Sequence, residues 1–156
     1  MRRRSAEQAF GVSLTISVLG LKAQVPAMVD TGNHLTDPLT GRPVIVVEYS
    51  ALAEVLPREF SSVVGDQEEA LDLSALLESL GSSPWAARFR PIPFRTLGLE
   101  RGMLPGFRPD SVLVEQGDLF LHTKDVVIAV CGRPLHGQGY YRALVNPVLM
   151  GDKVSA

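Results

Sequence analysis

Residues 25–38 of this 156-residue chain read VPAMVDTGNHLTDP, and the fold assignment begins from this motif. Within it, a short apolar run at 25–29 is followed at once by Asp30, Thr31 and Gly32. Asp and Gly after a strand are ordinary turn residues, because Asp bonds nearby backbone groups and Gly accepts a positive φ. Average residue usage gives an Asp-Ser/Thr-Gly triplet a chance of roughly one in ten in a chain this long. The triplet alone therefore fits either a plain turn or a catalytic carboxylate.

The composition indicates one globular domain. The chain is 46% hydrophobic and 21% charged, with a net charge of −2, and its length suffices to bury a core without disulfides or metal. This balance argues against disorder and against nucleic acid as a partner. The single cysteine, Cys131, cannot form an internal disulfide. We therefore expect a chain that folds in a reducing compartment, and no apolar stretch reaches the roughly 18 residues that span a bilayer.

Residues 1–10 form a basic arm. Arg2, Arg3 and Arg4 are followed directly by polar residues, without the apolar core of a signal peptide. Three arginines next to a membrane segment would suit the cytoplasmic side of a bilayer under the positive-inside rule. A flexible basic terminus explains the same residues equally well, and both interpretations stay open.

Apolar periodicity predicts a mainly β chain. Apolar residues alternate over 12–18, as in a half-buried strand, and Gly20 ends the pattern. The run at 25–29 predicts a second strand, and the continuous run at 44–47 predicts a third that is buried on both faces. Between these two, residues 34–43 carry Asp-Pro and Gly-Arg-Pro turn signals and predict a loop. Further strands are predicted at 91–96, 111–115, 119–123 and 126–131.

A helical segment is inserted among the strands at about 50–84. A short helix is predicted at 51–55, and a longer one at 68–80 that Gly81 ends as its C′ residue. The apolar face of the longer helix is predicted to hold Ala70, Leu73, Leu77 and Leu80. The segment is acidic, whereas the stretch that follows it is rich in arginine. Charge clusters of this kind are usually solvated surface.

A hairpin is predicted at 91–104, with Gly98 and Gly102 on either side of its turn. Several further motifs share one order along about residues 11–150, namely VDTGN, LTDPLTGRPVIVVE, FRPIPFRTLG, GMLPGFRPDSVLVE, KDVVIAV and YRALVNPVLM. In that order they resemble the sporulation sigma-E factor-processing peptidases. The C-terminal half of those proteins is a soluble aspartic protease domain similar to the retroviral proteases, the retropepsins.

The resemblance implies a mainly β, retropepsin-like fold, an acid protease half-barrel with a flap hairpin and the inserted helical segment. Residues 11–156 would be the aspartic protease domain. Residues 1–10 would be a linker from an N-terminal multi-spanning membrane domain that this chain lacks. The motif YRALVNPVLM departs from the family pattern, because Asn146-Pro147 stands where retropepsins have a glycine.

An aspartic protease needs two carboxylates that share one proton. The chain has only one Asp-Ser/Thr-Gly triplet, so the expected enzyme is a C₂ homodimer with Asp30 of each copy at its axis. The resemblance gives support roles to the next three residues. Thr31 would bond the opposite backbone, Gly32 would bring its amide to the carboxylate, and Asn33 would bond the carboxylate or a neighbouring loop.

The hairpin corresponds to the flap, which would close over an extended peptide by adding strand-like hydrogen bonds. The residues assigned to the flap and to substrate binding are Arg95, Gly98, Arg101 and Gly102. Two arginines in this set suggest an acidic segment in the substrate. No cofactor and no metal are expected.

The resemblance alone implies a substrate and a cellular location. The substrate would be the precursor of a sporulation sigma factor, which would lose its N-terminal prosequence. In a spore-forming bacterium the full-length protein would be tethered to the membrane, with the protease domain on the cytoplasmic side. A signalling protein would act on the membrane domain.

Other functions fit the sequence less well than a protease. A cysteine protease would use Cys131 with His122 or His136, but Cys131 ends an apolar strand, where a buried thiol is the ordinary case. His34 and Asp37 do not have the spacing of metal ligands with these histidines. The serious alternative is a retropepsin-like module that binds peptides or dimerises without cleaving them, in which the aspartate is only a turn residue.

Overall fold

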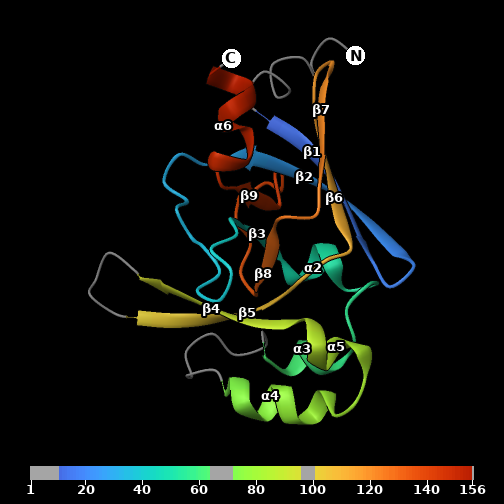
Figure 1. Ribbon diagram of the computed structural model, residues 1–156. Helices are drawn as coiled ribbons and strands as arrows, with labels where there is room; N and C mark the ends of the chain where they lie inside the picture. The colour runs from blue at the N-terminus through green and yellow to red at the C-terminus, as the bar shows by residue number, and fades with distance from the viewer. Residues whose placement is uncertain (1–10, 64–71, 96–100, 156) are drawn as a thin grey trace.

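A computed structural model describes the backbone of residues 11–63, 72–95 and 101–155 (Figure 1). The predicted arm at 1–10 and Gly98 lie outside these residues. The described strands are β1 (Gly11–Val18), β2 (Leu21–Val29), β3 (Val44–Glu48), β4 (Phe89–Arg95), β5 (Arg101–Phe107), β6 (Ser111–Gln116), β7 (Leu119–Thr123), β8 (Val127–Cys131) and β9 (Ala143–Val145). They form one sheet in the order β4-β5-β8-β3-β9-β2-β1-β6-β7. The prediction of a mainly β chain is confirmed.

A tight hairpin joins β1 to β2. Leu19 and Gly20 have φ angles of 52° and 83°, and two positive angles in a two-residue loop match the twist of the flanking strands. Leu14, Ile16 and Val18 are fully buried along β1, which confirms the predicted alternation. The second strand begins at Leu21, earlier than predicted, because its first half pairs with β1 along the whole hairpin.

Parallel pairing at the centre of the sheet brings distant segments together. Strand β9 runs parallel to β2 on one side and antiparallel to β3 on the other, and β3 runs parallel to β8. Strand β3 is buried over its whole length. Ile45 and Val47 face the larger core, and Val44 and Val46 face a smaller one, which confirms the predicted burial on both faces.

The predicted hairpin is confirmed, since β4 and β5 pair antiparallel up to Arg95 and Arg101. Gly102 lies inside β5 opposite Phe94, where a Cβ atom would collide with the phenyl ring. The prediction that Gly102 bounds the turn is therefore one residue off. At Gly106 a Cβ atom would lie 2.7 Å from the carbonyl oxygen of Ile128, so this position needs glycine for β5 to approach β8.

The described helices are α2 (Tyr49–Leu52), α3 (Glu59–Val63), α4 (Leu73–Leu80), α5 (Pro84–Arg88) and α6 (Val148–Ser155). Figure 1 shows α3, α4 and α5 gathered beneath the β4–β5 hairpin, with α6 at the opposite end of the molecule. None of the described helices has the length and apolar character needed to cross a bilayer.

An aromatic cluster attaches the inserted helices to the sheet. Phe60 makes edge contacts with Trp85 and Phe89, at ring-centroid distances of 5.9 Å and 6.4 Å. Trp85 in turn meets Phe107 of β5 at 5.2 Å. Such edge-to-face pairs add to the stability gained from burial alone. The segment is thereby packed on the base of the hairpin.

The predicted helix boundaries need three corrections. The first helix is α2, which runs from Tyr49 to Leu52; after it the chain reaches Pro57 through tight turns in which the N–H groups of Val55 and Leu56 donate to the carbonyl of Leu52. Helix α4 begins only at Leu73, where the side chain of Asp72 accepts a hydrogen bond from the backbone of Ala75. Helices α3 and α5 were not predicted, although Ser83 caps α5 and proline occupies its first position.

The buried face of α4 also differs from the prediction. Leu76 and Leu80 are buried, whereas Leu77 is exposed. Leu73 packs against the core, so from Leu73 onward the face follows an i, i+3, i+7 pattern instead of the predicted i, i+4, i+7. Ala70, also predicted for this face, lies outside the described residues. Gly81 has a φ of 61°, as expected for the residue that ends the helix.

Candidate active site

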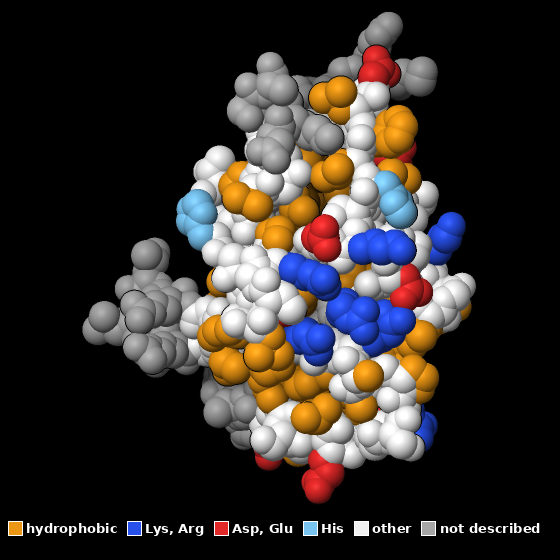
Figure 2. All heavy atoms as spheres, in the orientation of Figure 1, with side chains coloured by type: hydrophobic (Ala, Val, Ile, Leu, Met, Phe, Trp, Pro, Cys, Tyr) orange, Lys and Arg blue, Asp and Glu red, His pale blue; other side chains and the backbone are white. Residues whose placement is uncertain are grey.

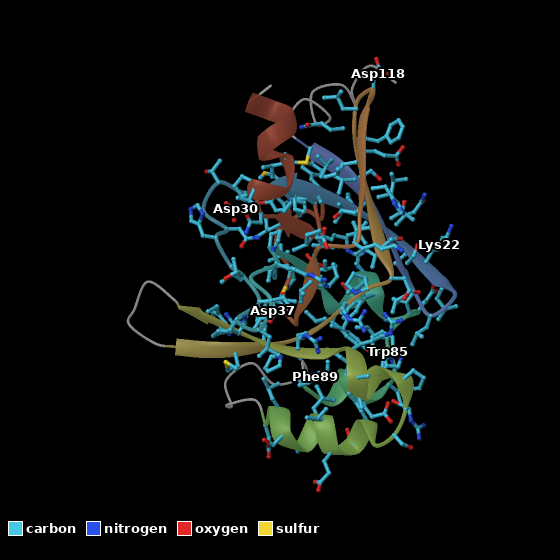
Figure 3. The ribbon with its side chains drawn as sticks, viewed as in Figure 1. Lys22, Asp30, Asp37, Trp85, Phe89 and Asp118 are labelled. Atoms are coloured by element: carbon cyan, nitrogen blue, oxygen red, sulfur yellow. The ribbon has the colours of Figure 1, made fainter. Side chains whose placement is uncertain are left out.

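Asp30 lies directly after β2, in a turn whose backbone is fixed by hydrogen bonds. Its N–H donates to the carbonyl oxygen of Val145 in β9 at 3.0 Å, and its own carbonyl accepts from the N–H of Asn33 at 2.9 Å. Figure 3 shows Asp30 between α6 and the β4–β5 hairpin. The parallel pairing of β2 with β9 therefore fixes the position of the Asp30 backbone.

The two oxygens of the Asp30 carboxylate differ. The N–H of Gly32 donates to Oδ1 at 2.9 Å. Within the described residues, Oδ2 has neither a hydrogen bond nor an ion pair. The side chain is half-buried. It is therefore held in one orientation while one oxygen can still reach a ligand or a water molecule.

The two remaining residues of the motif have different environments. Thr31 is exposed and makes no hydrogen bond through its side chain to the rest of the described chain. Asn33 is only 6% exposed, and its amide group donates to the carbonyls of Val44 and Leu144 at 3.1 Å and 3.2 Å. Asn33 thus ties the turn to β3 and β9 and does not bond the carboxylate.

Asn146 follows β9 and is 3% exposed. Its Nδ2 donates to the carbonyl oxygen of Leu35 at 3.0 Å, and its Oδ1 accepts from the N–H of Val148 at 2.9 Å. The residue that departs from the retropepsin glycine therefore fits the packing, with both ends of its side chain satisfied. The sequence showed only the departure, because the partner Leu35 lies far away in the chain.

A second aspartate of the same loop is fully engaged. Asp37 is 1% exposed. Its Oδ1 accepts from the N–H of Leu39 at 3.0 Å, its Oδ2 accepts from the hydroxyl of Thr40 at 2.9 Å, and Arg90 Nε lies 3.6 Å from Oδ2. Asp37 therefore acts as a structural residue of the turn.

The structure places only some of the residues that the sequence assigned to a flap. Arg95 and Arg101 face each other as the last pair of the β4–β5 ladder, and their side chains lie outside the described residues, as does Gly98. Figure 2 shows Lys and Arg side chains grouped on one face, with acidic side chains among them. Two arginines at the base of the hairpin already have acidic partners: Arg88 pairs with Asp110 at 2.6 Å, and Arg90 pairs with Asp37 at 3.6 Å. The predicted preference for an acidic substrate stays a prediction.

The sulfur of Cys131 is poorly suited to nucleophilic attack. Burial, together with the nearby Glu48 carboxylate, raises the pKa of the thiol to about 11, so it stays protonated at neutral pH, and the thiolate is the reactive form. His136 stacks on Tyr140 with ring centroids 4.9 Å apart. In the described part of the chain, no three His, Cys, Asp or Glu side chains come together as metal ligands.

The chain that carries this sheet and the Asp30 turn is related to known peptidases. Residues 1–149 match the model of the peptidase U4 family, described as the sporulation factor SpoIIGA, and the chain is a member of that family.

Three curated proteins are similar to the chain. It is 29% identical over 139 residues to a protein of Bacillus thuringiensis subsp. kurstaki that is provisionally named a sporulation sigma factor-processing peptidase; the match covers 89% of this chain and 83% of that protein. It is 31% identical over 150 residues to the sporulation sigma-E factor-processing peptidase of Priestia megaterium, covering 91% and 43%. For the protein of that name from Bacillus subtilis, the identity is 23% over 129 residues, covering 83% and 41%.

The chain thus spans less than half the length of the latter two relatives. No solved structure matches the chain.

Proposed function

We propose that this chain is an aspartic endopeptidase of the retropepsin type, active as a homodimer through Asp30. The observation that carries the proposal is the state of the Asp30 carboxylate, with one oxygen held by Gly32 and the other without a partner in the described residues. Asp37, in the same loop, has partners on both of its oxygens, whereas the second oxygen of Asp30 stays available to a water molecule or to a second copy of the chain.

The order of the elements supports the retropepsin type. A hairpin that ends in Asp-Thr-Gly is followed by the β4–β5 hairpin, where the flap is expected, and then by β6, β7 and β8. The chain ends in β9 and the helix α6, which correspond to the apolar residues and short helix that the resemblance implies. The inserted helices α2 to α5 enlarge this plan without interrupting the sheet.

A homodimer follows from the count of catalytic residues. The chain supplies one Asp-Thr-Gly, and the reaction needs two carboxylates, so a second copy completes the site on a two-fold axis. Thr31, exposed beside Asp30, is available to bond the backbone of the other copy. Two carboxylates at close range cannot both ionise cheaply, so one holds the shared proton.

In the proposed reaction, the ionised Asp30 takes a proton from a water molecule held between the two copies. The water oxygen bonds to the scissile carbonyl carbon, while the neutral Asp30 donates its proton to the carbonyl oxygen. In the collapse of the tetrahedral intermediate, the protonated Asp30 gives its proton to the amine nitrogen and the C–N bond breaks. The other Asp30 takes a proton from a hydroxyl of the intermediate as the carbonyl re-forms, which restores the dyad with one proton. The Gly32 amide keeps the carboxylate oriented during this exchange.

The proposed substrate is the precursor of a sporulation sigma factor, which would lose its N-terminal prosequence. The names of the similar proteins support this choice. The resemblance adds that the full-length protein is tethered by an N-terminal membrane domain, with the protease on the cytoplasmic side and a signalling protein acting on the membrane part. The Arg95 and Arg101 pair at the flap would favour an acidic stretch of the substrate.

The test is cleavage of the sigma-factor precursor by the chain joined to a dimerising coiled coil, with Asp30→Asn as the variant. Asn is nearly isosteric with Asp and still offers Oδ1 to the Gly32 amide. We expect the wild type to cleave at one position, and Asp30→Asn to dimerise but to cleave at least about 10³-fold more slowly.

The coiled coil removes weak dimerisation as an explanation for inactivity. If a folded, dimeric wild type cleaves none of the precursor but binds it, the non-catalytic peptide-binding module is the better description. Equal cleavage by Asp30→Asn would place the catalytic group elsewhere.

A further inference from the structure

We propose that Asn146 is a positioning residue for Asp30, holding the far end of the catalytic turn through its side-chain amide. The inference rests on the function proposed for the Asp30 site. Asn146 does not bond the carboxylate; its bonds run to Leu35 and Val148. Its effect on the reaction would pass through the backbone between Asp30 and Leu35.

Two consecutive residues hold the two ends of this turn. The carbonyl of Val145 accepts the N–H of Asp30 at 3.0 Å, and the side chain of Asn146 donates to the carbonyl of Leu35 at 3.0 Å. Any shift of the chain at the end of β9 would therefore move Asp30 and Leu35, the two ends of the turn, together. The turn cannot change its opening while both bonds are made.

Leu35 is the point where two buried amides meet. Its N–H donates to Oδ1 of Asn33 at 3.0 Å, and its carbonyl accepts from Asn146 and also from the N–H of Val44 at 3.1 Å. Asn33 and Asn146 are 6% and 3% exposed. In such a buried network each bond strengthens the next, and the loss of one partner leaves a polar group unpaired away from water.

The two polar atoms of the Asn146 side chain have different partners, and a substitution can remove one of the two bonds while keeping the other. Oδ1 accepts the N–H of Val148, the first residue of α6, as a helix cap does. Nδ2 serves Leu35. Asp at this position keeps the cap on α6 but loses the donor, and turns a carboxylate oxygen towards the Leu35 carbonyl. Asn146→Asp thus releases the turn and leaves the helix start in place.

The experiment compares Asn146→Asp with Val112→Ala in the coiled-coil dimer. Val112 is fully buried in β6, which lies between β1 and β7 in the described sheet, so its truncation destabilises the core away from the turn. A misplaced catalytic group costs up to about 10²-fold in rate. For Asn146→Asp we expect a fall in kcat of about 10- to 100-fold with KM nearly unchanged, and for Val112→Ala a kcat close to that of the wild type.

Amide hydrogen exchange of the full chain gives a second readout that does not depend on activity. The N–H groups of Gly32 and Leu35 should exchange faster in Asn146→Asp than in the wild type, and no faster in Val112→Ala. If Asn146→Asp does not fold, Asn146→Ser replaces it, because its hydroxyl can cap Val148 but is too short to reach Leu35.

Wild-type kcat in the Asn146 variant, or exchange at Gly32 and Leu35 equal to that in Val112→Ala, would overturn the inference. A wild type that cleaves no precursor would contradict the proposed function instead. The exchange of the two amides would then decide by itself whether Asn146 holds the turn.

Discussion

Asp30 and Asp37 belong to the same loop after β2, yet their carboxylates have different surroundings. Asp37 is 1% exposed, and both of its oxygens have partners. Asp30 is half-buried, and in the described residues only its Oδ1 has a partner. Figure 3 shows Asp37 nearer to the hairpin and Asp30 farther from it. Two aspartates of one loop thus differ in the partners of their oxygens, and only Asp30 keeps one oxygen available for the reaction proposed above.

The local sequence explains the difference. After Asp37, Pro38 and Gly41 close a tight turn in which Asp37 accepts backbone bonds on its carbonyl, from Gly41 at 2.7 Å, as well as on its side chain. After Asp30, Gly32 turns a single amide to the carboxylate, and Asn33 points away into the sheet. In both turns the aspartate accepts backbone N–H groups on its carbonyl and on Oδ1, but in the described residues only Asp37 has a partner on Oδ2, the hydroxyl of Thr40.

The largest expected effect is on the activity of Asp30→Asn. Cleavage of the precursor should fall by about 10³-fold or more, while the free energy of unfolding should stay within about 0.5 kcal/mol of the wild type, because Asn still accepts from Gly32. Urea unfolding and cleavage rates measured on the same preparations check both halves. A large loss of stability would make Asp30 a structural residue like Asp37.

Asp37→Asn should show the opposite pattern. The change removes a buried charge from Arg90 and turns an NH₂ group towards a donor, so the free energy of unfolding should fall by about 2 to 3 kcal/mol. Cleavage per folded molecule should stay within a few-fold of the wild type well below the melting temperature. An Asp37→Asn variant that keeps its free energy of unfolding but loses turnover would contradict the structural role of Asp37.

A smaller, pH-dependent effect is expected at Asp110. The Leu19 N–H donates to its Oδ2 at 2.9 Å, and this bond, followed by the Arg88 guanidinium, lowers the pKa of Asp110 below its usual 3.8. A lowered folded-state pKa contributes stability that is complete above the unfolded-state value and is lost as the pH falls through the folded-state value. Because the side chain is 44% exposed, the contribution should not exceed about 1 kcal/mol.

Urea unfolding of Asp110→Asn checks this prediction. The variant should be less stable than the wild type at neutral pH, and the two should converge as the pH falls below the lowered pKa of Asp110. Asp125→Asn is the matched control, since Asp125 is 83% exposed and lies 3.7 Å from Arg42; its stability should equal that of the wild type throughout. A difference that persists in acid would assign the effect to packing.

The local pattern of the sequence predicted much of the sheet. The alternation of apolar residues along β1 and the continuous apolar run of β3 predict which faces are buried. They do so because strand periodicity is short and each strand meets its partners over its whole length. Periodicity did less well in the insertion. Leu76 and Leu77 both fit a helical face in sequence, and only packing against the aromatic cluster around Phe60 and Trp85 decides which of them is buried.

The site was predictable in its motif and not in its supports. Asp30, Thr31 and Gly32 stand together in the sequence, and the bond from Gly32 to the carboxylate spans only two residues. The bond between Asn146 and Leu35 spans 111 residues. It exists because β9 enters the sheet between β2 and β3, and parallel pairings of this kind depend on the whole topology.

The most direct test of paired Asp30 carboxylates uses two copies of the chain joined in one polypeptide, with Asp30→Asn in neither, one or both halves. If the two carboxylates form one site, the tandem with a single Asn should cleave the sigma-factor precursor as slowly as the tandem with two, about 10³-fold below the unchanged tandem. Cleavage at about half the unchanged rate by the single-Asn tandem would show that each copy works alone, and would contradict the account.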